Sequence, residues 1–284
     1  MLAYRHAFHA GSHADVLKHL VLTLVLRHMN GKDKGYRFVD THAGAGGYSL
    51  EGDYANKRAE HTQGIGRLWG RDDLPPAVAD YVDRVRQFNG DGRLAQYPGS
   101  PGFAHLLLRP QDQMRLFELH PTDHRILASY LGSQPGVEVG MRDGFESLRR
   151  VLPPPTRRGV LLIDPPYELK ADYPRVLAAV REALNLFADG TVIVWVPQLQ
   201  LLEPTQLIDR LKPTAQQQAK KGWLHARLTV APPAANGFGL LGSSVVVINP
   251  PHTLKATLHE VLPWLAKTLA QFDGARSVLE SGGG

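Results

Sequence analysis

Cysteine is absent from this 284-residue chain. Its absence excludes disulfide bonds and metal sites built on thiolate ligands. No apolar run approaches the roughly 20 residues that a membrane-spanning helix needs. The first twenty residues interrupt their apolar positions with histidine, lysine, arginine and aspartate, unlike a signal peptide. We therefore expect a cytoplasmic protein without a membrane segment.

Acidic residues are fewer than basic ones. The chain has 27 Asp and Glu against 32 Lys and Arg, and its net charge is +5. Because lysine and arginine that neutralise phosphates release counterions, this excess mildly favours a polyanionic partner. Hydrophobic residues make up 43% of the chain. That content and length suit one large α/β domain, with or without an insertion.

Apolar runs of strand length alternate with segments of helical spacing along most of the chain. We expect seven strands, at 36–40, 113–119, 136–140, 159–163, 190–197, 222–230 and 243–250. Helices are predicted at 14–29, 103–109, 121–131, 173–187 and 253–270. Such alternation is typical of a mainly parallel, doubly wound sheet. The last two strands have no helix between them, so we expect them to pair antiparallel.

The segment 51–98 breaks this alternation. It is polar and contains short amphipathic pieces such as 76–88. We interpret it as a small helical subdomain inserted into a main domain formed by 1–50 and 99–284. Its basic and aromatic residues are candidates for RNA contact, although a solvated helical cap explains them equally well: Lys57, Arg58, Arg67, Trp69 and Arg71.

Four strands end on or just before a carboxylate, namely Asp40, Glu118, Asp143 and Asp164. Ligands of open α/β sheets bind outside these carboxyl ends. The first strand runs into "DTHAGAGG", in which glycines such as Gly44 let the backbone turn tightly and approach a ligand. The turn lacks the Lys-Ser/Thr of a P-loop, and by itself is also compatible with a plain structural turn.

Two of these carboxylates fit a nucleoside ligand. Glu118 can accept hydrogen bonds from ribose hydroxyls. Asp143 can accept one from an adenine amino group, and Gly144 lets the ring approach closely. A solvated acid and a helix N-cap remain the alternatives for Glu118 and Asp143, respectively. Together with the glycine-rich turn, they predict a pocket for an adenosine-bearing cofactor.

The fourth strand ends in Asp164-Pro165-Pro166-Tyr167. An adenine amine is a poor nucleophile, and a carboxylate and a backbone carbonyl that accept from it would polarise it. Paired prolines stiffen the backbone that holds this carbonyl, and the tyrosine offers a face for a flipped base. Asp164 would then accept the surplus proton. A [D/N/S]-P-P-[Y/F/W] corner behind a glycine-rich turn therefore indicates methyl transfer to an amino group.

The motifs "DTHAGAGGY" and "DPPYE", with the N-terminal "YRHAFHAGSHADVLKH", resemble the bacterial ribosomal RNA large subunit methyltransferase J family. The resemblance covers essentially the whole chain. It implies a Rossmann-like class I methyltransferase that uses S-adenosylmethionine to methylate N6 of one adenine in 23S ribosomal RNA. It also implies cofactor contacts from seven residues: His19, His42, Ser100, Glu118, Asp143, Gly144 and Asp164. We add Lys18, which is next to His19 in the sequence.

The same resemblance assigns Tyr4 to the RNA substrate. We expect a monomer that acts on protein-free 23S ribosomal RNA or on an early assembly intermediate. His6, His9 and His13 lack the companion ligands of a metal site, so no metal is expected. A DNA adenine methyltransferase and a catalytically inactive RNA-binding protein remain the alternatives.

Overall fold

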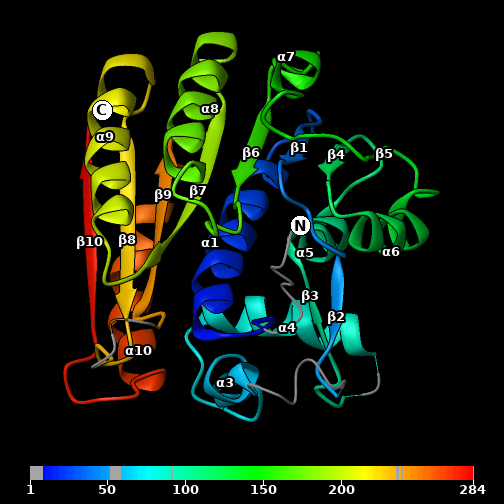
Figure 1. Cartoon of the computed structure of the whole chain (residues 1–284). Helices are drawn as coiled ribbons and strands as arrows, with labels where there is room; N and C mark the ends of the chain where they lie inside the picture. The colour runs from blue at the N-terminus through cyan, green and yellow to red at the C-terminus, as the bar shows by residue number, and fades with distance from the viewer. Residues whose placement is uncertain (1–8, 52–58, 91, 235–236, 238, 284) are drawn as a thin grey trace.

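The chain, seen in a computed structural model, is described over residues 9–51, 59–90, 92–234, 237 and 239–283. Its centre is an eight-stranded sheet in the order β10-β8-β9-β7-β6-β1-β4-β5 (Figure 1). The strands are β1 (Arg37–Asp40), β4 (Gln113–Phe117), β5 (Val137–Gly140), β6 (Gly159–Ile163), β7 (Thr191–Gln198), β8 (Trp223–Thr229), β9 (Gly242–Ile248) and β10 (Arg276–Gly282).

Strands β7, β6, β1, β4 and β5 are parallel to one another. β8 and β9 pair antiparallel, as expected from the missing helix between them. The expected count of seven strands was one too low, because β10 adds an antiparallel edge strand beside β8. The glycine-rich end of the sequence suggests fraying, yet residues 280–282 belong to this strand. Their side chains are largely exposed, so they lack the apolar pattern that marks a buried strand.

Helices cover both faces of the sheet, and each face has its own hydrophobic core. One core lies under α7 (Leu148–Val151), α8 (Asp172–Leu186) and α9 (Leu202–Gln218), the last two of which stand in front of the strands in Figure 1. The opposite core lies under α1 (His13–Asn30), α5 (Ser100–Leu107), α6 (Pro121–Leu131) and α10 (Leu254–Thr268). This three-layer arrangement confirms the predicted α/β class with a mostly parallel sheet.

Helix α1 is buried over most of its length, including Asp15, Lys18 and His19. A helix that is apolar nearly all round belongs inside a protein, and α1 contacts α5, β7 and β9. It therefore carries polar side chains into the interior.

The segment between β1 and α5 adds a two-stranded sheet of β2 (Gly47–Ser49) and β3 (Gln96–Pro98). Between these strands lie η2 (Glu60–Gln63), α3 (Gly66–Trp69) and α4 (Pro76–Asn89), and α4 contacts α1, α5 and α10. The division into a main domain and an inserted subdomain at 51–98 stays a prediction.

Candidate active site

A cavity of about 1020 Å³, counted with its open mouth, lies at the carboxyl ends of β1, β4 and β6. The chain leaves β1 toward β4 on one side and later places β6 on the other, so this is the switch point where such sheets bind ligands. Of the predicted site residues, it is lined by Lys18, His19, His42, Gly44, Ser100, Glu118, Asp164, Pro165 and Pro166.

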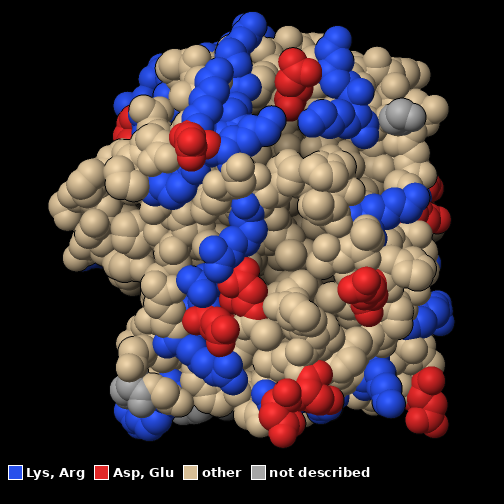
Figure 2. Space-filling view, turned by 180° about the vertical axis from the view of Figure 1, so that it is seen from behind, with Lys and Arg blue, Asp and Glu red and all other residues tan. Residues whose placement is uncertain are grey.

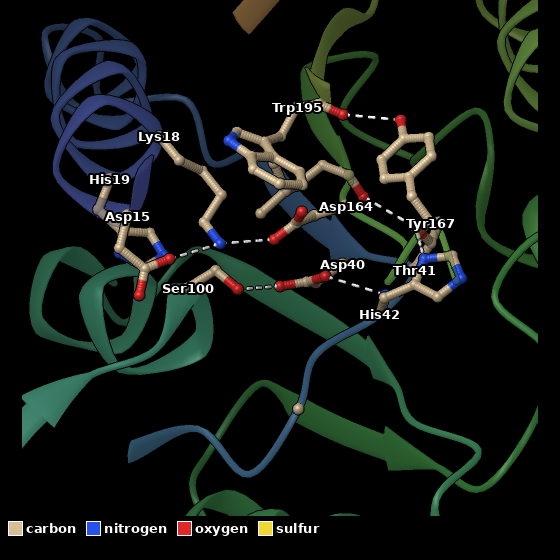
Figure 3. Close-up of polar contacts among 12 residues, drawn as sticks. Asp15, Lys18, His19, Asp40, Thr41, His42, Ser100, Asp164, Tyr167 and Trp195 are labelled. Carbon is tan, nitrogen blue, oxygen red and sulfur yellow. Dashed lines mark hydrogen bonds and ion pairs between the residues drawn. The ribbon is translucent and has the colours of Figure 1, made fainter. Parts of the chain in front are cut away.

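Lys18 lies between two carboxylates. Its Nζ is 2.8 Å from Asp15 and 2.6 Å from the Oδ2 of Asp164, as Figure 3 shows. Burial disfavours the ammonium ion, but the two carboxylates outweigh it and raise the Lys18 pKa. The indole of Trp195 lies 5.7 Å from the same nitrogen. Asp164 is therefore held at the cavity wall by a fixed positive charge.

Asp40 lies behind this wall, fully buried at the end of β1. Its carboxylate accepts a 2.6 Å hydrogen bond from the Ser100 hydroxyl and one of 3.1 Å from the His42 backbone N–H (Figure 3). Burial raises the pKa of Asp40 to about 7, although both hydrogen bonds oppose the shift. Asp40 thus orients two residues of the cavity lining without lining it.

Glu118 faces the glycine-rich turn. Its carboxylate accepts hydrogen bonds from the backbone N–H groups of Gly44 and His120. Burial raises its pKa, against the effect of these bonds. Each carboxylate oxygen retains a further lone pair, so Glu118 can still accept from ligand hydroxyls. At Gly44, φ is +61° and a Cβ would lie 2.2 Å from the Tyr48 hydroxyl, which explains the glycine.

The two histidines of the lining differ in their surroundings. His42 contacts the Thr41 hydroxyl at 2.8 Å, and burial lowers its pKa to about 4. His19 Nδ1 lies 2.8 Å from the hydroxyl of Tyr97, and its ring packs on Phe103. Both rings are therefore oriented by protein contacts. His42 is neutral near pH 7.

Asp143 and Gly144 do not line the cavity. Asp143 accepts hydrogen bonds from the backbone of Phe145 and Glu146 and forms a 2.5 Å ion pair with Arg175. At Gly144, a Cβ would meet the Thr41 carbonyl oxygen at 2.2 Å, which by itself accounts for the glycine. Gly144 is required by neighbouring backbone, and adenine contact by either residue stays a prediction.

Tyr167 also lies outside the lining. Its side chain is buried between Tyr173 and Trp195, and its hydroxyl donates to the Trp195 carbonyl at 2.7 Å (Figure 3). The expected open stacking face is therefore not available in this arrangement. The polar end of Tyr167 instead ties the DPPY corner to β7.

Tyr4 lies outside the described residues, as do His6, Lys57 and Arg58. The described RNA-contact candidates of the insertion have protein partners. Arg67 donates to the carbonyls of Thr268 and Ala270, and Arg71 pairs with Asp73. Trp69 lies 5.6 Å from the guanidinium of Arg86. For Arg67, Trp69 and Arg71, these contacts favour the alternative of a solvated helical cap over RNA contact.

Asp15, Tyr97 and Trp195 were not singled out from the sequence, although they hold Lys18, His19 and Tyr167. The only signal for Asp15 was its spacing of three residues from Lys18, which places both on one helix face. Within the described ranges, no group of three His, Asp or Glu could hold a metal ion. The helices of the described residues also lack the length and apolar character that spanning a membrane requires.

The cavity suits a cationic nucleoside. Its lining has four acids, Glu118, Asp123, Asp164 and Asp172, against two cations, Lys18 and Arg175. Acceptors and acidic groups are thus in excess, and the backbone at Gly44 can approach a ligand closely.

The chain is similar to known proteins over nearly its whole length. Two proteins named ribosomal RNA large subunit methyltransferase J are each 43% identical to the chain. One is from Escherichia coli and the other from Haemophilus influenzae, and each match covers 95% of this chain and 94% of the relative. The crystal structure of protein LPL1258 from Legionella pneumophila matches with a TM-score of 0.87 and 33% identity, over 96% of this chain and 98% of that one.

A family model described as "Ribosomal RNA large subunit methyltransferase D, RlmJ" matches residues 33–279. The fold, the extent of this match and the two curated relatives show that the chain belongs to the RlmJ family of ribosomal RNA methyltransferases.

Proposed function

We propose that this chain transfers a methyl group from S-adenosylmethionine to N6 of one adenine in 23S ribosomal RNA. The observation that carries the proposal is the carboxylate of Asp164, which lines the cavity beside Pro165 and Pro166 at the end of β6. Membership of the RlmJ family supports ribosomal RNA as the substrate. The bound cofactor would supply an electrophilic methyl on a sulfonium, whose bond from sulfur to the methyl carbon breaks during transfer and leaves a neutral thioether.

The residues of the cavity would act on the adenine amine. Asp164 accepts a hydrogen bond from N6 and afterwards the proton that N6 loses when its bond to the methyl carbon forms. Lys18 fixes the direction of the Asp164 carboxylate through their 2.6 Å contact. Pro165 and Pro166 restrict the backbone of the corner, so that its geometry is set in advance of substrate binding.

Glu118, Ser100, His19 and His42 would hold the cofactor, and Tyr4 the RNA. Asp143 and Gly144 are proposed to contact the adenine of the cofactor, beside the ion pair of Asp143 with Arg175. Tyr167 could stack on a flipped base only if the DPPY corner rearranges. We further propose that the protein is a cytoplasmic monomer and that its substrate is protein-free RNA or an early assembly intermediate.

Asp164→Ala tests the proposal. We expect it to abolish methyl transfer to 23S ribosomal RNA while cofactor binding survives in part, because Lys18 keeps Asp15 as its partner. Glu168→Ala is the matched control, since Glu168 is the exposed acid of the same loop. Transfer would be followed as N6-methyladenine in protein-free RNA, with duplex DNA as competitor.

Full turnover by Asp164→Ala would refute the role of the carboxylate. Methylation of the DNA in preference to the RNA would instead favour a DNA adenine methyltransferase. Failure of the wild-type chain to bind S-adenosylmethionine would favour an inactive RNA-binding protein.

A further inference from the structure

Basic side chains gather at the end of the molecule opposite the cavity, where the parallel strands β1, β6 and β7 begin. Figure 2 shows a band of Lys and Arg across this end, at the top of the view. We name it the amino-end patch and define it by four exposed cations, one half-buried arginine and two histidines: Lys32, Lys34, Arg157, Lys221, Arg158, His28 and His252.

The charge of the patch is not balanced by nearby acids. No ion pair joins Lys32, Lys34 or Lys221 to an acid within the described parts of the chain. Two exposed acids, Asp33 and Asp189, lie at this end, and the nearby Asp112 is buried and paired with Arg109. The five lysines and arginines of the patch outnumber these two exposed acids. Positive charge therefore remains in excess at this end of the molecule.

Like charges of the patch lie close enough to affect one another. The rings of His28 and His252 are 5.2 Å apart. Burial lowers the pKa of His28, and so do the positive charges of His252, Lys221, Lys32 and Arg158. Four separate connecting segments thus bring their charges close to His28. A polyanion that bound here would relieve this repulsion.

The loops of the patch are anchored from behind. Arg158 donates to the carbonyls of Met29 and Lys34, and Arg109 donates to those of Asn30 and Lys32. The buried Asn249 accepts from the backbone N–H of Lys221 at 2.8 Å and donates to Ala188 and Gly190. The lysines therefore project from fixed backbone, which reduces the entropy lost when they bind a ligand.

The patch lies far from the cavity. Lys18 lines the cavity and Lys32 follows the far end of α1, fourteen residues later. At 1.5 Å per helical residue, they are about 20 Å apart. A single nucleotide in the cavity does not span this distance, so a ligand of the patch is a different part of the same polymer or a different molecule.

We propose that the amino-end patch binds the phosphate backbone of a segment of the substrate RNA remote from the target adenine. This inference rests on the proposed function, which supplies an RNA long enough to reach both places. Phosphate contacts position a protein on a nucleic acid without reading its sequence. The patch would thus set the register in which the RNA presents its adenine.

The test compares Lys32→Glu/Lys34→Glu/Lys221→Glu with Arg181→Glu/Arg210→Glu/Lys267→Glu. The control changes charge equally at exposed residues of α8, α9 and α10. The probes are a protein-free 23S ribosomal RNA transcript and a short hairpin that holds only the target adenine and its closing pairs. Affinity is measured against salt concentration, and methyl transfer at saturating RNA is measured separately.

For the patch variant on the long transcript, we expect roughly tenfold weaker binding. The slope of log K against log salt concentration should decrease in magnitude by about two to three. Hairpin binding, S-adenosylmethionine binding and transfer at saturation should match wild type, which also shows that the variant folds. An unchanged slope would overturn the inference. So would an equal loss of affinity of the patch variant for the hairpin, or an equal loss of affinity of the control variant for the transcript. If wild type binds the transcript through the patch but does not methylate it, the proposed function fails and the patch stands.

Discussion

Lys18 and Asp40 are two buried groups at the cavity that differ in their partners. Lys18 has ion pairs, whereas the partners of Asp40 are hydrogen-bond donors. Lys18 is buried with two carboxylates, so its ammonium form is favoured in the folded chain. Asp40 has hydrogen-bond donors but no direct ion pair within the described residues, and burial therefore raises its pKa to about 7. The different partners decide which of the two groups titrates near neutral pH.

Asp40 predicts how stability depends on pH. Its pKa of about 7 exceeds its ordinary value of 3.8, so between these values the folded state holds a proton that the unfolded chain releases. The contribution of Asp40 to the free energy of unfolding is therefore full below about pH 4 and is lost as pH rises through about 7. Asp40→Asn mimics the protonated acid, so the difference between variant and wild type isolates this group.

Denaturant titrations at pH 4.5 and 8 check the prediction. The variant should gain stability relative to wild type as pH rises between these values, because every other group is common to both proteins. A difference that stays constant with pH would show that Asp40 has the same pKa in both states.

At the scale of elements, β10 closes the edge of the sheet. It pairs with β8 over seven residues, from Arg276 opposite Thr229 to Gly282 opposite Trp223. Glu280 reaches across to His225 on β8 and to Lys212 on α9. The strand therefore covers an edge that would otherwise expose unpaired backbone groups.

Ending the chain after Ala275 removes β10. We expect the midpoint of thermal unfolding to fall by several degrees, since each kcal/mol corresponds to about 2–4 °C in a domain of this size. The exposed β8 edge should also promote aggregation on heating. Removal of residues 283–284 alone is the control and should change neither property. An unaltered midpoint after the longer truncation would mean that β10 adds nothing to stability.

At the scale of the whole molecule, the sheet topology places the cavity at the switch point, where we propose that S-adenosylmethionine binds. A ligand that binds only the folded chain stabilises it by mass action. S-adenosylmethionine at a hundred times its Kd should contribute about 2.7 kcal/mol. The expected rise in melting temperature is about 5–10 °C.

Thermal melts with and without S-adenosylmethionine check this expectation, with ATP as the control adenosine compound. Glu118→Ala should reduce the rise, because Glu118 is proposed to hold the cofactor. An equal rise with ATP would indicate a general adenosine site instead. No rise at any concentration would contradict the assignment of the cavity.

Much of the site could be predicted because parallel strands bring their carboxyl ends to one edge. That rule alone places Asp40, Glu118 and Asp164 at the same edge of the sheet. It could not separate residues that line the cavity from those behind it. Asp40 supports Ser100, and Tyr167 turns into the core, because side-chain direction depends on packing against neighbouring elements.

The local pattern of this chain determined its strands, its glycine-rich turn and its acidic corner, since periodicity and backbone restriction are properties of short segments. Tertiary structure alone decided the pairing of Lys18 with Asp164, 146 residues apart, and the gathering of the amino-end patch from four connecting segments and the end of α1. It also decided the eighth strand, which has no fully buried residue and pairs antiparallel with β8. Contacts between distant segments depend on how helices and strands pack, and that information is spread over the whole chain.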